Sequence, residues 1–273
     1  ACLCPTAAGY LLVPVSFLNA IDALGDVPPS DGDVVILPVA ATEAHGPHLP
    51  ASTDCDIARG HLDNLAGRSI FETRVYVLPI EAIGASREHA RFASTLSVDE
   101  ADLIARWFAI CERVALSDRR RIIIVSSHGG NTPTVDAVIL RARAELGLLA
   151  VGTAWMRFGQ PEGLFNPHER RYGIHGGDVE TSLMLHYAPQ SVAMENAKDF
   201  VSELVTLEGE MRHLTGYGPH RFGWLSNDLN PHGVVGNATA ATAEKGQMLA
   251  DHIVSGFAEL IDDVAAFDLK WLK

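Results

Sequence analysis

Four short runs of apolar residues, rich in valine and isoleucine, recur along the chain. They span residues 34–40 (VVILPVA), 74–80 (RVYVLPI), 121–127 (RIIIVSS) and 148–155 (LLAVGTAW). The apolar positions in each run are nearly continuous instead of alternating with polar ones. This pattern is typical of strands that are buried on both faces of a sheet. The runs therefore predict four central strands.

The segments between and after these runs have the spacing of amphipathic helices. Apolar residues recur every three to four positions in residues 97–116, 132–146, 177–188 and 243–267. In the first of these segments, Ser97 with Glu100 three residues later predicts an N-terminal cap. Strands that alternate with helices predict a mostly parallel sheet with helices on both faces, which is an α/β fold.

The chain shows no composition break, long linker or repeat, so we expect a single domain over residues 1–273. Residues 200–235 are the least regular part and are rich in glycine and proline. This composition predicts long surface loops that could cover a functional site.

The charge balance narrows the classes of partner. Lysine and arginine number 21 against 34 aspartates and glutamates, which gives a net charge of −13. Nucleic acids and anionic membranes need basic surface, so neither is an expected partner. No apolar run reaches the ~18 residues of a membrane span, and the N-terminus lacks the basic segment of a signal peptide. We therefore expect a cytoplasmic protein. Cys2 and Cys4 have no second pair that would complete a metal site.

Polar clusters follow the first three predicted strands. They are TEAHGPHLPASTD (42–54), GASREHARFASTLS (84–97) and SHGGN (127–131), and a fourth cluster, HGGDVETS (175–182), opens a predicted helix. The carboxyl ends of the strands in an open α/β sheet lie at one edge, where ligands bind. Three clusters at this edge predict a functional site.

The ionisable side chains of these clusters suit a metal centre. Glu43 and His45 point to the same side if their segment is extended, and Asp54 can return to them after a loop shaped by prolines. His128 and Glu180 add an imidazole and a carboxylate. Two imidazoles and three carboxylates suit Zn, Mn or Fe(II). This set exceeds the needs of one tetrahedral ion and predicts two divalent ions, with Asp54 as their bridge, that can activate a water.

Some residues of the clusters have a structural interpretation beside the functional one. His48 lies among prolines and is predicted to support the loop rather than to bind metal. Cys55 is predicted to be a buried, inert thiol. Glu88 and His89 could be a solvated pair, but their place at the same edge favours a role in the site, with Glu88 as a catalytic residue.

Several separated motifs occur in a set order: LPVAATEAHGPHLPASTD, GASREHARFASTLS, SSHGGN, HGGDVETS and GVVGNATAATAEKG. Together they resemble the creatininase, or creatinine amidohydrolase, family over about residues 34–250. The resemblance implies a single-domain, three-layer α/β/α sandwich, usually assembled into hexamers. It also implies a dinuclear metal centre that hydrolyses a non-peptide C–N bond, often in a cyclic amide or formamide.

The resemblance also implies roles for single residues. Glu43, His45, Asp54 and His128 match metal ligands of the family, with Asp54 bridging. His175 matches the histidine that is proposed to shuttle a proton in catalysis. Glu180 matches a conserved glutamate of the same motif, so we expect it to serve in the metal site and in catalysis.

Two departures from the family pattern concern the substrate and one ligand. The creatinine-hydrolysing members carry a glutamate ligand at the position of Gly130, so we assign that ligand role to Glu180 instead. They also carry a tryptophan shortly before the catalytic histidine, where this chain has Arg171 and Tyr172, which argues against creatinine itself. Arg171, Tyr172, Gly129 and Gly130 are the residues that we expect to contact the substrate.

The resulting hypothesis is an amidohydrolase with two divalent metal ions per subunit, Zn first and Mn or Fe(II) as alternatives. It would hydrolyse a cyclic amide, a formamide or a related small molecule by attack of a metal-bridging hydroxide. One alternative is a relative that trims a precursor peptide with the same site. A two-metal phosphoesterase would need basic phosphate-binding elements, which are missing. A binding protein without activity should have lost at least one of the five ligands.

Overall fold

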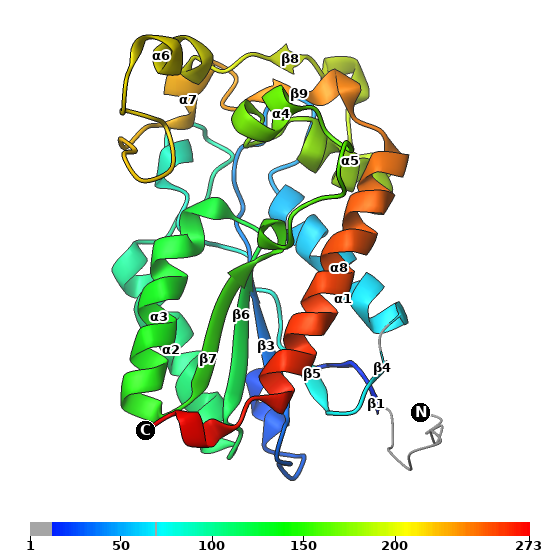
Figure 1. Cartoon of the computed structure of the whole chain (residues 1–273), viewed down its shortest axis with the longest axis vertical. Helices are drawn as coiled ribbons and strands as arrows, with labels where there is room; N and C mark the ends of the chain where they lie inside the picture. The colour runs from blue at the N-terminus through cyan, green and yellow to red at the C-terminus, as the bar shows by residue number, and fades with distance from the viewer. Residues whose placement is uncertain (1–12, 69) are drawn as a thin grey trace.

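A five-stranded parallel sheet forms the centre of the computed structural model, which describes residues 13–68 and 70–273 (Figure 1). Cys2 and Cys4 lie outside the described residues. In spatial order the strands are β2 (Ser16–Phe17), β5 (Val75–Val77), β3 (Val34–Val39), β6 (Arg121–Ser126) and β7 (Leu149–Ala154). All neighbouring strands of this sheet pair in parallel.

The register aligns the carboxyl ends of the two central strands. β3 and β6 pair from Val34 with Arg121 to Val39 with Ser126, so both strands end at the same level. The polar clusters that follow them therefore begin side by side at one edge of the sheet.

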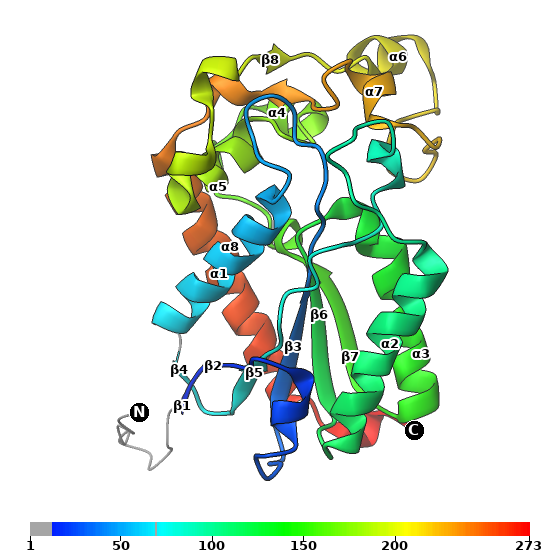
Figure 2. The ribbon, with the colours of Figure 1, turned by 180° about the vertical axis from the view of Figure 1, so that it is seen from behind.

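Helices cover both faces of the sheet (Figures 1 and 2). One face carries α2 (Glu100–Leu116) and α3 (Thr132–Leu146), and the other carries α1 (Thr53–Arg68), α5 (Asp178–Tyr187) and α8 (Ala243–Ala266). Successive residues of β3 point to opposite faces. Val34 and Ile36 join the apolar core under α1, α5 and α8, whereas Val35 and Leu37 join the core under α2 and α3.

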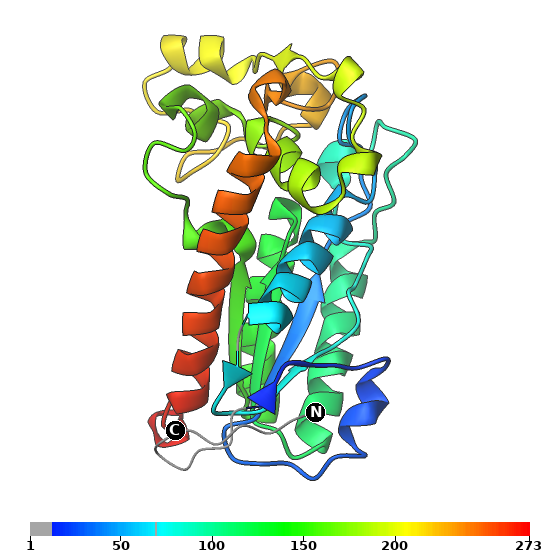
Figure 3. The ribbon, with the colours of Figure 1, turned by 90° about the vertical axis from the view of Figure 1, so that its right-hand side faces the viewer.

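Short elements lie beyond the carboxyl edge of the sheet (Figure 3). They are α4 (Pro167–Tyr172), α6 (Leu204–Glu210), α7 (Ser226–Leu229) and the antiparallel pair of β8 (Asp199–Phe200) with β9 (Gly236–Asn237). At the opposite end β1 (Val13–Pro14) pairs with β4 (Ile70–Phe71). Short 3-10 helices span Ile21–Leu24, Arg87–His89, Gly129–Asn131, Trp155–Phe158, Pro189–Ser191, Met194–Asn196, Ala238–Ala240 and Leu269–Trp271.

The predicted α/β/α sandwich is confirmed, with each predicted strand and helix present, but the structure differs from or adds to the prediction in three local details. Asp99, not Ser97, caps α2, since its side chain accepts a hydrogen bond from Ala101 N. The Ser97 hydroxyl accepts one from Ser86 N instead. Asp54 lies in the first turn of α1, a helix that the apolar pattern did not reveal.

Residues 200–235 are the third case, because they contain more than loops. Short helices α6 and α7 form there around a small apolar core of Leu204, Leu229 and Val235, against which Trp224 and Tyr217 pack. The described residues contain no helix with the length and apolar character needed to cross a membrane.

Candidate metal centre

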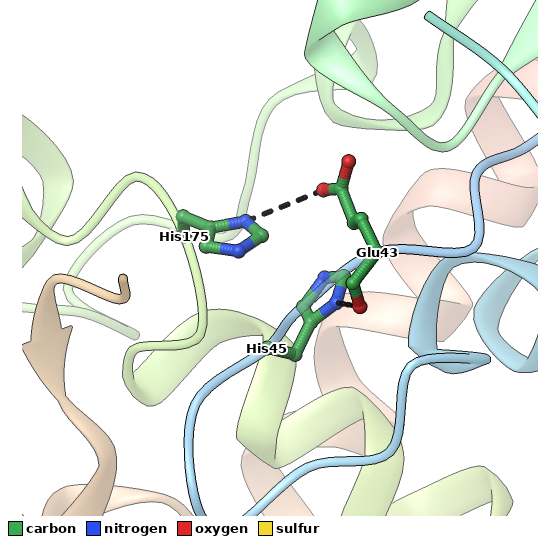
Figure 4. Close-up of side chains that lie close together, drawn as sticks. All are labelled: Glu43, His45 and His175. Carbon is green, nitrogen blue, oxygen red and sulfur yellow. Dashed lines mark hydrogen bonds and ion pairs between the residues drawn. The ribbon is translucent and has the colours of Figure 1, made fainter. Parts of the chain in front are cut away.

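The predicted ligands converge at the carboxyl edge of the sheet. Glu43 and His45 follow β3, Asp54 enters from the first turn of α1, and His128 follows β6. These four side chains are buried. Glu180, from the first turn of α5, is partly exposed and completes the group. Figure 4 shows Glu43 and His45 with His175 close to both of them.

The distances divide these residues into two sets that share one carboxylate. In the first set, His128 Nδ1 lies 3.2 Å from Glu43 Oε1 and 3.7 Å from Asp54 Oδ2. In the second set, His45 Nε2 lies 3.7 Å from Asp54 Oδ1 and 3.8 Å from Glu180 Oε2. Within each set the ligand atoms lie within 4.8 Å of one another. Because each Asp54 oxygen faces a different set, the geometry suits a carboxylate that bridges two ions.

Unpaired polar atoms support this fit. Both carboxylate oxygens of Glu43, Nε2 of His45 and Oδ2 of Asp54 are buried and have no hydrogen-bond partner among the described residues. Buried polar atoms without partners are rare and costly in folded proteins. Two divalent cations would satisfy these atoms together, and a donor set of nitrogen and oxygen suits Zn, Mn or Fe(II).

Backbone carbonyls fix the orientation of the two imidazoles. His45 Nδ1 lies 3.1 Å from Glu43 O, and His128 Nε2 lies 2.8 Å from Ala85 O. When these nitrogens donate their protons to the carbonyls, the other nitrogen of each ring faces the centre as an acceptor, as is usual for metal-binding histidines. A Cβ at Gly130 would collide with the His128 ring and would lie 2.6 Å from Glu88 Oε1. Position 130 therefore requires glycine and supplies no ligand.

The side chains of this cluster have pKa values that differ from their ordinary values, in opposite directions for the two carboxylates. Burial raises the pKa of Asp54 well above its ordinary value, and the charge of Glu43 adds to the effect. Burial also opposes the charge of Glu43, but the neighbouring His128 outweighs it and holds the pKa of Glu43 well below its usual range. Burial acts against a charged His128 as well, yet Glu43 and Asp54 raise the pKa of His128 to about 10. Divalent cations compete with these protons, so metal binding should release them.

His175 lies beside the centre on the side of the cavity. Its Nε2 lies 2.9 Å from Ala44 O, and its Nδ1 lies 3.7 Å from Glu43 Oε1 and 3.9 Å from Glu180 Oε2 (Figure 4). Gly176 N donates a hydrogen bond of 2.6 Å to Glu180 Oε2, so the turn that carries His175 also positions Glu180.

Glu169 is a structural partner of this turn that sequence reasoning missed. It is buried in α4, where it accepts hydrogen bonds from Asp178 N at 2.7 Å and from Asn237 N at 2.9 Å. A Cβ at Gly173, Gly177 or Gly236 would collide with its carboxylate. Glu169 thus joins α4, the start of α5 and β9 around the segment that holds His175.

The remaining ionisable residues of the clusters lie around the candidate metal centre. His48 is buried, and its Nε2 lies 3.0 Å from both Gly176 O and Thr181 Oγ1. These contacts stabilise the turn that carries His175. Cys55 is buried, which raises the pKa of its thiol to about 11. Glu88 Oε1 lies 3.4 Å from His128 Nε2, and His89 Nε2 lies 3.6 Å from Glu43 Oε1. These two residues therefore contact the ligands and are not a solvated pair.

A cavity of about 600 Å³ opens directly above the centre. Glu43, Glu88, His89, His128 and His175 form its polar part, Gly129, Gly130, Thr132 and Pro133 line one side, and Tyr217, Arg221, Phe222, Trp224, Ser226 and Leu229 line another. The predicted contacts Gly129 and Gly130 therefore face the cavity. Arg171 and Tyr172 are not among its described lining residues, since Arg171 instead pairs with Glu208 at 2.7 Å. Their role in substrate binding stays a prediction.

Comparison with known proteins gives consistent matches over most of the chain. The family model described as "Creatininase: Creatinine amidohydrolase" matches residues 23–261. A Mycobacterium tuberculosis (strain CDC 1551 / Oshkosh) protein named mycofactocin precursor peptide peptidase is 30% identical, over 89% of this chain and 88% of its own length. A Thermotoga maritima protein named 3-dehydro-scyllo-inosose hydrolase is 25% identical, over 85% of this chain and 78% of its own length. A mutant creatininase of Zn-Zn type has the same fold, with a TM-score of 0.71 and 21% identity over 92% of this chain and 98% of that chain.

Proposed function

The chain belongs to the creatininase family, and from this premise we propose that it is a metal-dependent hydrolase that cleaves an amide bond in a short peptide. The observation that carries the proposal is the cavity of about 600 Å³ above the cluster of ligands. Pockets of about 300–1,000 Å³ accommodate drug-sized ligands, so this one has room for two or more amino-acid residues. The peptidase name of the mycobacterial relative supports the same choice.

Five side chains would hold the metal ions. Glu43, Asp54 and His128 would bind one ion, and His45, Asp54 and Glu180 the other. Two divalent ions, Zn as in the related Zn-Zn creatininase or Mn or Fe(II), supply Lewis acidity toward a carbonyl oxygen and lower the pKa of a water when they are bound.

His175 is the group best placed to move a proton. When its Nε2 donates to Ala44 O, Nδ1 is the ring atom left to carry a proton, and the residue lines the cavity. An imidazole in this position can deliver that proton to the leaving nitrogen as the amide bond breaks. Glu88 lines the same cavity and is a second candidate for general base catalysis.

A non-peptide amide is the second candidate substrate, and it is the first expectation of the sequence analysis. The Thermotoga relative supports a small molecule, since its name gives 3-dehydro-scyllo-inosose as the compound hydrolysed. We rank the peptide ahead of the non-peptide amide because the cavity has the volume for two or more residues and the relative with the higher identity carries a peptidase name. A phosphoesterase gains little support, since Arg221 is the single arginine or lysine among the described lining residues.

The test is hydrolysis by the metal-loaded protein, measured by mass spectrometry on short peptides and on a separate set of lactams, formamides and cyclic ureides. We expect peptide cleavage that stops after chelation and returns with Zn or Mn. Turnover of the small amides with every peptide left intact would reverse the order of the two candidates.

The variant Asp54→Ala tests whether the hydrolysis depends on the two ions. Because Asp54 contributes to both sets of ligands, the variant should retain neither ion and show no hydrolysis. Metal analysis after gel filtration measures the retained ions. Two tightly bound ions in this variant would overturn the bridging role of Asp54.

A further inference from the structure

The wall of the cavity formed by residues 216–229 carries a cation without a carboxylate partner. Arg221 is the only lysine or arginine among the described lining residues. Its Nη1 makes a long hydrogen bond of 3.4 Å to Gly218 O, and no carboxylate of the described residues lies within ion-pair distance. Arg171, on the same side of the molecule, differs because Glu208 neutralises it at 2.7 Å. The charge of Arg221 is therefore available to a ligand.

The loop that carries Arg221 is held by its own hydrogen bonds. Phe222 N donates to Thr215 O at 3.2 Å, and Thr215 N donates to His220 O at 3.2 Å. The Trp224 indole donates to Gly216 O at 2.7 Å and packs in the apolar core beneath the loop. These hydrogen bonds hold the backbone of the loop, and the exposed side chain of Arg221 extends from it at the cavity.

A second polar group and an apolar surface lie on the same wall. Ser226 is 4% exposed and lines the cavity, and its buried Oγ has no hydrogen-bond partner in the described part of the chain. Phe222, Trp224 and Leu229 line the cavity around these groups. The wall thus offers a guanidinium, an unused hydroxyl and aromatic faces within one pocket.

We propose that Arg221 and Ser226 bind a free carboxylate of the substrate, next to an apolar side chain that packs on Phe222 and Trp224. A guanidinium binds a carboxylate through two parallel hydrogen bonds, and a hydroxyl can donate a third. The proposed function assigns the ions of the metal centre to the amide that is cleaved, and away from that centre Arg221 is the only arginine or lysine among the described lining residues that can pair with a carboxylate. The inference rests on the proposed function and defines the substrate class: a short peptide with a free carboxyl terminus and an apolar last residue.

The test compares two peptides that differ only at the end. Metal-loaded protein is assayed with Ala-Ala-Ala-Phe as the free acid and as the carboxamide, and kcat/KM is measured for both. Because hydrogen bonds to a charged group are lost with the carboxamide, we expect the acid to be preferred by about tenfold or more. Arg221→Met should lower kcat/KM for the acid much more than for the carboxamide, so that most of the preference for the acid is lost.

Arg212→Met is the matched control, since Arg212 is exposed and is not among the lining residues. It should keep the full preference for the acid. Ser226→Ala should reduce the preference by less than Arg221→Met, because it removes one neutral donor. Equal metal content in all variants, checked by elemental analysis, assigns the change to the wall and not to the metal centre.

The outcomes separate this proposal from the function on which it rests. Equal cleavage of acid and carboxamide by the wild type, or an equal loss for both in Arg221→Met, overturns the carboxylate site while peptide hydrolysis stands. Failure to cleave either peptide, together with turnover of a lactam or formamide, overturns both.

Discussion

Single residues fix the metal centre mainly through the backbone. The imidazoles of His45 and His128 each contact a carbonyl oxygen, and Glu180 accepts from Gly176 N. Glu169 extends this pattern, because both of its oxygens accept from backbone N–H groups. Burial raises the pKa of Glu169, although its two backbone donors favour the charged form. Its role is therefore to position the turn around His175 rather than to act on the substrate.

Glu169→Gln tests this positioning role. The amide NH₂ must replace one acceptor oxygen opposite a backbone N–H, and an unsatisfied buried donor costs about 1–3 kcal/mol. We expect kcat to fall by about tenfold or more, with KM and metal content nearly unchanged, because the turn shifts while the ligands remain.

The matched control is Asn166→Ala, which removes the cap of α4 but keeps the Glu169 carboxylate. It should lower the free energy of unfolding by about 1 kcal/mol and leave kcat unchanged. A Glu169→Gln variant with wild-type kcat would show that the carboxylate does not position His175.

The residues of the centre were predictable to different degrees. Glu43, His45 and His128 follow predicted strands, so their convergence follows from the parallel sheet. Asp54 was predicted at the same place but reached it by a helix. Glu169 was hidden, because Asn166 followed by Glu169 three positions later has the pattern of a capping box, in which the glutamate returns to the helix end. Its carboxylate is surrounded by three glycines that are scattered in the sequence and come together only in the fold.

At the scale of elements, the contact of α5 with α8 supports the centre from one side. Gly246 of α8 lies against Ser182 O of α5, so closely that a Cβ at this position would collide with it. Lys245 of α8 pairs with Asp178, the first residue of α5, at 2.6 Å. The close approach of the two helices therefore fixes the position of α5, and with it the position of Glu180 relative to His45.

Gly246→Ala should separate the two helices. Overpacking a buried contact costs about 1–3 kcal/mol, which exceeds the gain of up to about 1 kcal/mol from replacing glycine in a helix. We expect a lower midpoint in urea unfolding. Gly67→Ala in α1 is the control, since a Cβ there would meet no described atom within 4 Å outside its chain neighbours and the backbone of its own helix, and it should be neutral or stabilising. An unchanged midpoint for Gly246→Ala would mean that the helices adjust without cost.

The elements that could be predicted are those with a strong pattern. The central strands are continuous apolar runs, and α2 and α8 have clear apolar stripes. Helix α1 was missed because Asp54, Asp56, Arg59 and Asp63 interrupt a sparse stripe. The small core of residues 200–235 could not be foreseen, since Leu204 is far in sequence from Trp224 and Leu229 and meets them only in the fold.

For the whole molecule, the ligands link elements that the sheet alone does not join. Glu43 follows β3, Asp54 belongs to α1, His128 precedes α3 and Glu180 belongs to α5. Ions bound to all of these would connect the helices on both faces through one point. Ligands that bind only the folded state stabilise it by mass action.

Metal removal should therefore lower thermal stability. An ion at a concentration a hundred times its Kd adds about 2.7 kcal/mol, so removal of two such ions, about 5.4 kcal/mol in all, should lower Tm by roughly 10–20 °C. Differential scanning calorimetry of chelated and reloaded protein measures the shift, which should saturate at two ions per chain. Asp54→Ala should show no response to added metal. An identical Tm with and without metal in the wild type would argue against ions that link these elements.

The crowding around Gly130 constrains how this family could diversify. Any side chain there meets the His128 ring, the Ala85 carbonyl and Glu88 at once. A lineage that exchanged this glycine for a carboxylate would need a prior change in the segment around Glu88 to clear the space. A carboxylate at this position would thus require coupled substitutions, because the space next to Glu88 must open before a longer side chain fits.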